Sequence, residues 1–270
     1  MPLSGKVVWI TGASSGIGRA LAREFAVAGA KLALSGRRTQ QLDQVRSEIE
    51  GEAIAVPCDV CVEQQQSDAV STIVKRFGRL DVAVANAGFS VSGRIDQLTA
   101  ADWRRQFDTN VVGAAVTASV ALPELTKTRG RIALVGSVAA FLPSPGFAAY
   151  HASKYAVRAL GRTLSAELAG SGVSCTTVHP GFVVSEINRV DNHGRHDPKR
   201  PEMRPQQLMW PTDKAARVIF RAIRSRRREL VFTGHGKIAS WLGMNFPSLA
   251  HFVMTRPAML RQAKEFEVEE

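Results

Sequence analysis

Tyr150 and Lys154 are the residues whose types and spacing point most directly to chemistry. On a helix, side chains four positions apart share a face. A free phenol, with a pKa of about 10, is a poor base at neutral pH, but a neighbouring ammonium stabilises the phenolate. The pair therefore predicts proton transfer by Tyr150. Ser137 closes an expected strand, where its hydroxyl can hold the oxygen atom that reacts.

A glycine-rich segment, TGASSGIG, follows the first apolar run at residues 11–18. Glycine lets the backbone turn tightly and approach a pyrophosphate, which the N-terminus of the next helix then stabilises. The segment lies between an expected strand and an expected helix, as a dinucleotide-binding turn requires. The candidate contacts in this turn are Gly12, Ser14, Ser15, Gly16, Ile17, Gly18 and Arg19.

Two arginines, Arg37 and Arg38, follow the second expected strand, and the next carboxylate is Asp43 inside the following helix. An acidic residue about 20 positions after the glycines binds the ribose hydroxyls of NAD, whereas arginine accommodates the 2′-phosphate of NADP. The two guanidinium groups therefore predict that NADP(H) is preferred over NAD(H). The alternative is that both arginines are solvated charges at the start of a helix.

Short apolar runs alternate with amphipathic stretches along most of the chain, which predicts an α/β fold. About seven runs apolar on both faces predict a doubly wound parallel sheet, a Rossmann fold. We expect one catalytic and cofactor-binding domain over residues 1–234, a substrate-loop insertion at 184–211 and an apolar helical extension at 235–270. The expected strands are Lys6–Thr11, Lys31–Ser35, Ala53–Pro57, Asp81–Ala85, Arg131–Gly136, Ser174–His179 and Glu229–Phe232; the expected helices are Ile17–Ala28, Thr39–Glu50, Glu63–Phe77, Thr99–Thr126, Ala149–Ala169 and Thr212–Arg227.

Five motifs in order make residues 5–232 resemble the short-chain dehydrogenase/reductase superfamily. They are TGASSGIG, the Asn86-Ala87-Gly88 triplet, Ser137 after the fifth strand, the Tyr150-x-x-x-Lys154 pair and Pro180-Gly181 after the sixth strand. The resemblance implies a catalytic set of Asn110, Ser137, Tyr150 and Lys154. It adds, as cofactor contacts, Asp59, Val60, Asn86, Ala87, Gly88, Tyr150, Lys154, Pro180, Gly181, Val183 and Ser185.

The same resemblance implies an NADP(H)-dependent oxidoreductase that interconverts a carbonyl and a secondary alcohol. Lys154 would also contact the nicotinamide ribose, and Asn110 would support a water that links Lys154 to solvent. Asp59 and Val60 would hold the adenine. The resemblance also implies a homodimer or tetramer that pairs the 99–126 and 149–169 helices across a two-fold axis. The extended C-terminus would block one tetramer interface, which favours the dimer.

The substrate is expected to be hydrophobic, because the irregular segments carry Phe141, Leu142, Phe147 and Phe182, which indicate an apolar pocket beside the catalytic residues. A different class of protein also fits the cofactor motifs: a redox sensor that holds NADP(H) without turnover, for which the loss of Tyr150 or Lys154 would be expected. A peripheral membrane scaffold is a third reading, based on the C-terminal segment alone.

Composition sets further limits. The odd number of cysteines, three in 270 residues, predicts reduced thiols in a cytoplasmic protein, and the Cys58-x-x-Cys61 pair lacks the nearby ligands that a metal site needs. We find no signal sequence and no membrane-spanning stretch. The net charge is +11, but no nucleic-acid-binding motif accompanies it.

The excess charge includes six arginines between Arg217 and Arg228, which form either a solvated helix face or a patch for an anionic membrane or a phosphorylated substrate. The apolar segment at 237–260 has two readings. It packs back on the core or on a partner subunit, or it docks on anionic lipid together with those arginines.

Overall fold

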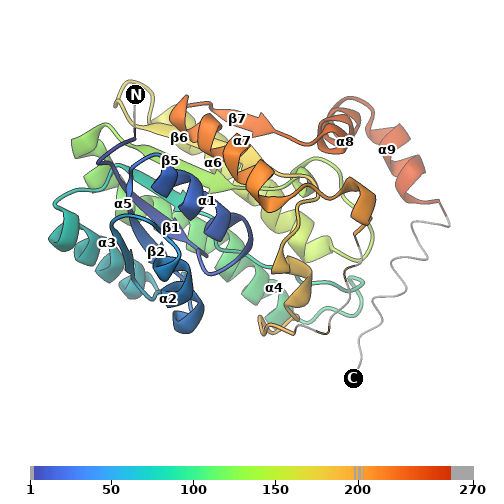
Figure 1. The fold of residues 1–270 in the computed structure, drawn as a ribbon. Helices are drawn as coiled ribbons and strands as arrows, with labels where there is room; N and C mark the ends of the chain where they lie inside the picture. Colours follow the sequence, from blue (N-terminus) through green and yellow to red (C-terminus); the bar gives the residue numbers. More distant parts are fainter. Residues whose placement is uncertain (1–2, 198, 200–201, 203, 257–270) are drawn as a thin grey trace.

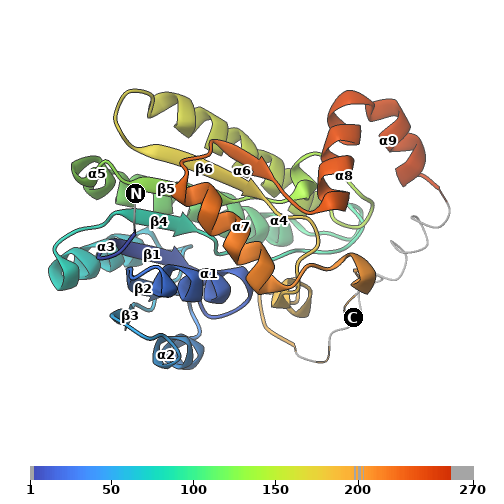
Figure 2. The same cartoon turned by 45° about the horizontal axis from the view of Figure 1, so that its top comes forward.

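A single seven-stranded parallel sheet forms the centre of the molecule (Figures 1 and 2). The computed structural model describes residues 3–197, 199, 202 and 204–256. The strand order is β3-β2-β1-β4-β5-β6-β7. Successive strands are added on one side of β1 up to β3 and on its other side from β4 onward, so the predicted doubly wound fold is confirmed. The strands are β1 (Val7–Thr11), β2 (Lys31–Ser35), β3 (Ala53–Ala55), β4 (Val82–Ala85), β5 (Arg131–Val135), β6 (Ser174–His179) and β7 (Glu229–Val231).

Helices cover both faces of the sheet, because each central strand is apolar on both sides. In β1, Val8 and Ile10 pack into one core cluster, and Val7 and Trp9 pack into the other. The first cluster lies under α1 (Gly16–Val27), α2 (Thr39–Ser47) and α7 (Thr212–Arg224). The second lies under α3 (Glu63–Phe77), α5 (Gly113–Thr128) and α6 (Ala148–Glu167).

The helix expected over 99–126 is not uniform. It consists of α4 (Ala100–Phe107), a π-helical turn at Asp108–Val112, and α5. Thr99 caps α4 through a reciprocal capping box with Asp102. The π turn, which hydrophobic periodicity does not reveal, holds Asn110. Such turns recur at functional sites.

The chain beyond β6 leaves the regular pattern. The expected insertion at 184–211 holds short 3₁₀ segments at Glu186–Arg189 and Gln206–Leu208. After β7, the chain forms α8 (Gly234–Asn245) and α9 (Pro247–Met254), which stand out at one end of the molecule (Figure 2). The rest of the C-terminal segment, 257–270, lies outside the described residues. Among the described helices, none is long and apolar enough to cross a membrane.

Candidate active site

A cavity of about 530 Å³ opens beyond the carboxyl ends of the strands, where ligands bind in doubly wound sheets. Most of the residues that the sequence singles out line it. Gly18 and Asn110 do not; both lie behind its wall and support it. The predicted residues that line the cavity are Gly12, Ser14, Ser15, Gly16, Ile17, Arg37, Arg38, Asp59, Val60, Asn86, Ala87, Gly88, Ser137, Tyr150, Lys154, Pro180, Gly181, Val183 and Ser185.

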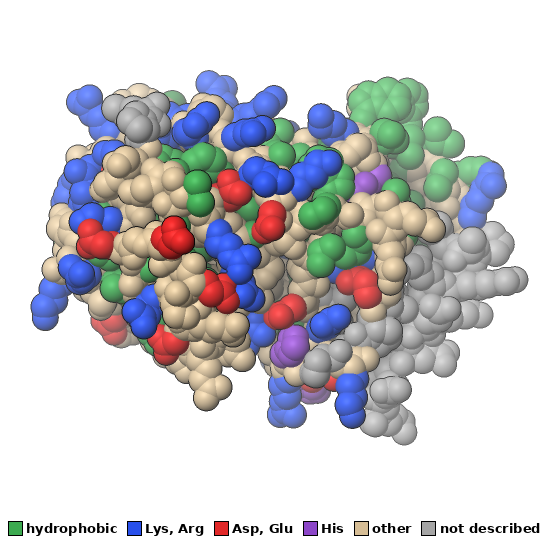
Figure 3. Space-filling model, in the orientation of Figure 1, with side chains coloured by type: hydrophobic (Ala, Val, Ile, Leu, Met, Phe, Trp, Pro, Cys, Tyr) green, Lys and Arg blue, Asp and Glu red, His purple; other side chains and the backbone are tan. Residues whose placement is uncertain are grey.

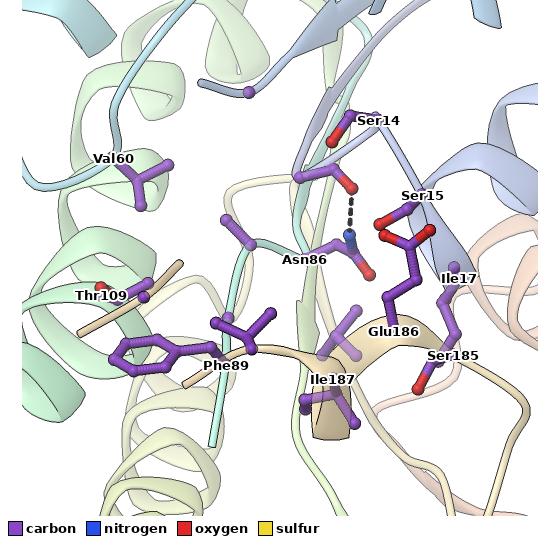
Figure 4. A pocket seen from close by; sticks show the side chains of 18 of the residues that line it. Ser14, Ser15, Ile17, Val60, Asn86, Phe89, Thr109, Ser185, Glu186 and Ile187 are labelled. Atoms are coloured by element: carbon purple, nitrogen blue, oxygen red, sulfur yellow. Dashed lines mark hydrogen bonds between the residues drawn. The ribbon is translucent and has the colours of Figure 1, made fainter. Parts of the chain in front are cut away.

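The glycine turn is packed so closely that side chains would not fit. Gly12 has a φ of +64°, and a Cβ there would lie 2.8 Å from the Ala87 Cα. A Cβ on Gly18 would lie 2.3 Å from the carbonyl oxygen of Gly12. Asn86 fixes the turn from the next strand, since its Nδ2 donates to the carbonyl oxygens of Thr11 at 2.9 Å and Gly12 at 3.1 Å (Figure 4). The absence of a side chain at Gly18 therefore lets the turn close against Asn86.

The two predicted NADP-selecting arginines differ in their surroundings. Arg38 donates to the hydroxyls of Ser14 at 3.1 Å and Ser15 at 2.7 Å, and to Glu186 Oε2 at 2.9 Å. Arg37 donates to the carbonyl oxygen of Gly194 at 3.2 Å, in the insertion. Arg19, a further phosphate candidate, is instead paired with Glu48. Arg38 and the two serines thus form a donor cluster at the edge of the glycine turn.

The catalytic candidates meet at the other side of the cavity. Lys154 is buried, and its Nζ donates to the carbonyl oxygen of Val135 at 3.0 Å and lies 5.7 Å from the Tyr150 ring centre. The two residues share one face of α6, as their spacing predicts. Ser137 follows β5, begins a 3₁₀ turn, and lines the same cavity as Tyr150 and Lys154. The fold therefore brings all three groups together.

The pKa of Tyr150 is raised in the folded protein, not lowered as expected. Burial raises the pKa of Tyr150, and the Ser137 hydroxyl and the Arg204 charge only partly oppose this. Burial also lowers the pKa of Lys154 to about 8, because desolvation penalises the ammonium. The expectation that Lys154 lowers the phenol pKa neglected this shared burial.

Asn110 supports the segment that follows β4. Its Oδ1 accepts from the Phe89 N–H at 3.1 Å, and its Nδ2 donates to the Phe89 carbonyl oxygen at 3.0 Å and to the Ser153 hydroxyl at 3.1 Å. Gln106, which sequence reasoning missed, holds the same segment. It donates to the Phe89 carbonyl oxygen at 2.9 Å and accepts from the Val91 N–H at 2.7 Å. Its position one helical turn before Asn110 was the available signal.

Ser137 also has a partner that the sequence did not indicate. Buried His179, at the end of β6, places Nδ1 3.2 Å from the Ser137 carbonyl oxygen and Nε2 3.0 Å from Glu229 Oε1. Glu229 is in turn bound by Arg158 of α6 at 2.9 Å. Three neighbouring elements thereby fix the backbone that carries Ser137.

The apolar part of the cavity is formed by different residues from those expected. Phe89, Val183, Ile187 and Val190 line it, and Figure 4 shows Phe89 and Ile187 on its wall. Of the residues expected there, Phe141 is buried beside His179 and Phe182 stacks on His235. Neither they nor Leu142 and Phe147 are among the described residues that line the cavity.

The cysteine pair shows no arrangement for redox chemistry. Cys58 and Cys61 are free thiols, and burial raises the pKa of Cys58 to about 11, which makes its thiol a weak nucleophile. Cys61 contacts the Thr109 hydroxyl at 3.4 Å. Among the described residues, no group of three or more His, Cys, Asp or Glu side chains is placed to hold a metal ion.

Known proteins resemble this chain in sequence and in architecture. The short chain dehydrogenase family matches residues 6–196. The human protein named dehydrogenase/reductase SDR family member 4 is 34% identical over 226 residues, which are 81% of each chain.

Two solved structures superpose closely. One is an alcohol dehydrogenase from Thermococcus sibiricus complexed with 5-hydroxy-NADP (TM-score 0.73, 28% identity, 84% of this chain and 95% of that chain). The other is a 3-ketoacyl-(acyl-carrier-protein) reductase from Brucella melitensis complexed with NADH (TM-score 0.76, 26% identity, 86% and 98%). The family match, the human relative and the shared sheet agree. The chain belongs to the short-chain dehydrogenase/reductase family and is an NAD(P)-dependent oxidoreductase acting on alcohol or carbonyl groups.

Proposed function

We propose that this chain is an NADP(H)-dependent oxidoreductase that interconverts a carbonyl and a secondary alcohol on a hydrophobic substrate, with Tyr150 as proton donor and acceptor. The observation that carries the proposal is one cavity with Tyr150, Ser137 and Lys154 on one side and the Arg38 donor cluster at the glycine turn. The volume of about 530 Å³ lies within the range of small-molecule and cofactor sites.

The residues around the cavity fit a nicotinamide dinucleotide. The glycine turn begins α1, whose N-cap residue Ser15 makes no side-chain cap bond, so the first turn of the helix retains N–H groups for phosphate. We assign Arg38, Arg37 and Ser14 to the adenosine phosphate. Asp59 and Val60 would hold the adenine, and Figure 4 places Val60 across the cavity from Ser185. The remaining proposed contacts are Gly12, Ser15, Gly16, Ile17, Asn86, Ala87, Gly88, Tyr150, Lys154, Pro180, Gly181, Val183 and Ser185.

Proton transfer is the task of the protein's own side chains. The bound cofactor supplies or accepts the hydride. In reduction, Tyr150 donates its phenolic proton to the substrate oxygen, which Ser137 holds by a hydrogen bond. Lys154 stabilises the phenolate that results, since its ammonium lies 5.7 Å from the ring centre. In oxidation, the phenolate takes the proton back. Asn110 acts by holding the Phe89 backbone beside this group.

The proposed substrate class follows from the cavity wall. Phe89, Val183, Ile187 and Val190 present apolar surface, and burying such surface favours an apolar ligand. A steroid or a long-chain keto compound fits this wall better than a sugar, whose hydroxyls would lose their hydrogen bonds to water there.

A panel assay tests the proposal. NADPH and NADH oxidation would be measured against steroids, long-chain keto compounds, quinones, aldehydes and small sugars, with Tyr150→Phe as the control. We expect NADPH-dependent turnover of an apolar carbonyl that the variant loses by at least about a hundredfold. Turnover that persists in Tyr150→Phe would refute the assigned mechanism.

We further propose a homodimer formed through α5 and α6. Two of the exposed large apolar side chains lie here: Val112, at the end of the π turn that leads into α5 (49% exposed), and Tyr155 on α6 (42% exposed). Sedimentation equilibrium tests this: the wild type should have twice the chain mass, and Tyr155→Asp should dissociate it. A monomeric wild type at micromolar concentration would contradict the dimer.

A peripheral contact with anionic membrane is a second proposal, carried by α8 and α9. These helices and the turn between them expose six large apolar side chains. The chain holds no Asp or Glu between Glu229 and Glu265. Figure 3 shows this apolar cluster beside a face rich in Lys and Arg. Such a combination is typical of interfacial helices. The cluster consists of Ile238, Trp241, Met244, Phe246, Leu249 and Phe252.

Liposome flotation tests this contact. The wild type should float with vesicles of anionic lipid at low salt, and the Trp241→Ser/Phe252→Ser double variant should not. Ile95→Ser, which removes an even more exposed apolar side chain elsewhere, is the control. Failure of the wild type to float even at low salt would end the proposal.

A further inference from the structure

A carboxylate of the protein lies within the proposed phosphate site. Glu186, the first residue of a 3₁₀ segment in the 184–211 insertion, accepts from Arg38 Nη1 at 2.9 Å. Figure 4 shows its carboxylate facing the hydroxyl of Ser15. His196 Nε2 lies 3.7 Å from the same carboxylate oxygen. Glu186 is therefore held by groups that suit an anion.

The same donors are those assigned to the cofactor. Arg38 uses Nη2 and Nε on the hydroxyls of Ser14 and Ser15, and it uses Nη1 on Glu186. A phosphate bound by Arg38 and Ser15 would meet a carboxylate that is already paired with Arg38 and faces Ser15. Two anions repel each other when they share one guanidinium, so Glu186 and the phosphate oppose each other here.

We propose that Glu186 competes with the phosphate groups of the cofactor for Arg38 and Ser15, and so weakens cofactor binding. The inference rests on the proposed role of Arg38 in holding NADP(H). It adds to that role a residue 148 positions away in the chain that limits how tightly the cofactor is held. Glu186 is a positioning residue for Arg38, because it acts on the cofactor through that guanidinium and the neighbouring hydroxyl.

The expected size of the effect on cofactor binding follows from the solvent exposure of the two paired side chains. The side chains of Arg38 and Glu186 are 32% and 39% exposed, so solvent screens their attraction. Ion pairs of this kind contribute little, and their loss corresponds to a roughly two- to fivefold change in a dissociation constant. The competitor is thus weak enough for the cofactor to displace.

Nucleotide titration tests the competition without any turnover. Dissociation constants for NADPH and NADH would be measured by calorimetry on the wild type, Glu186→Gln and Glu52→Gln. Glu52 is the matched control because it also lies beside two basic side chains, Lys31 and Arg76, but precedes β3 at the amino end of the strands. We expect Glu186→Gln to tighten nucleotide binding by about two- to fivefold and Glu52→Gln to leave it unchanged.

The two nucleotides distinguish which phosphate Glu186 opposes. A gain confined to NADPH assigns the competition to the 2′-phosphate, and an equal gain for NADH assigns it to the pyrophosphate. Unchanged or weaker binding in Glu186→Gln, with normal binding by the wild type, overturns this inference and leaves the proposed function intact. A wild type that binds neither nucleotide would instead refute the proposed function.

Discussion

The amide of Asn110 pairs with both backbone groups of Phe89, accepting from the N–H at 3.1 Å and donating to the carbonyl at 3.0 Å. Phe89 lines the cavity, and Asn110 is 2% exposed. A side chain behind the wall therefore fixes the backbone of the wall. Because Gln106 holds the same segment from α4, the two amides can be compared directly.

We expect Asn110→Ala and Gln106→Ala to destabilise the protein by a similar amount, about 1–3 kcal/mol each. Either substitution leaves buried backbone groups of the same segment without their hydrogen-bond partners. Only Asn110→Ala should also lower kcat strongly, since Asn110 alone reaches Ser153 on the catalytic helix. Thermal unfolding and steady-state kinetics measure the two effects. Equal losses of kcat would reduce Asn110 to a structural role.

Lys154→Met is expected to raise thermal stability at neutral pH while it abolishes turnover. Burial lowers the pKa of Lys154 from 10.5 to about 8, so the buried ammonium opposes folding below pH 8. The penalty is at most about 3 kcal/mol at pH 7. It fades as pH rises from 8 to 10.5, because the native state then holds the neutral amine.

Unfolding midpoints across this pH range measure the effect. The gain in Lys154→Met should shrink as pH rises, and the exposed Lys127→Met should show no such trend. A Lys154→Met variant that is less stable at pH 7 would show that the hydrogen bond to Val135 outweighs desolvation.

Gly18→Ala should disrupt the cofactor turn. The new Cβ would lie 2.3 Å from the Gly12 carbonyl oxygen and 2.6 Å from Asn86 Nδ2, so the backbone must shift. Overpacking of this kind costs about 1–3 kcal/mol of stability, and the displaced turn should weaken NADPH binding. Gly234→Ala, with nothing within 4 Å of the new Cβ, is the control for both measurements. Unaltered binding by Gly18→Ala would contradict the assigned turn.

Arg38→Ala should weaken NADPH binding about tenfold or more and change NADH binding much less, because charge-assisted hydrogen bonds to phosphate are the strong ones. Calorimetric titration of both nucleotides gives the ratio. Arg217→Ala, an exposed arginine on α7, controls for the loss of one positive charge. Parallel losses for the two nucleotides would place Arg38 on a phosphate that both share.

The amino-acid sequence alone determined the architecture and most of the cavity. Parallel strands that are covered on both faces must be apolar on both faces. This pattern is local, and it can be recognised in the sequences of β1 and β5, which are buried throughout. The glycine turn and the Tyr150–Lys154 spacing are equally local, because a tight turn and one face of a helix are each fixed within a few residues. Accordingly, nineteen of the predicted site residues line the cavity.

Only the tertiary structure decided the rest. Glu186 pairs with Arg38, which is 148 positions earlier in the chain. His179 of β6 contacts the carbonyl oxygen of Ser137, which is 42 positions earlier. The apolar wall comes from Phe89 and the insertion rather than from the loop before Tyr150. No local pattern encodes such contacts, because they depend on which elements the sheet order places together. The burial of a side chain also depends on which elements the fold packs around it. The directions in which the pKa values of Tyr150 and Lys154 shift therefore follow only from the tertiary structure.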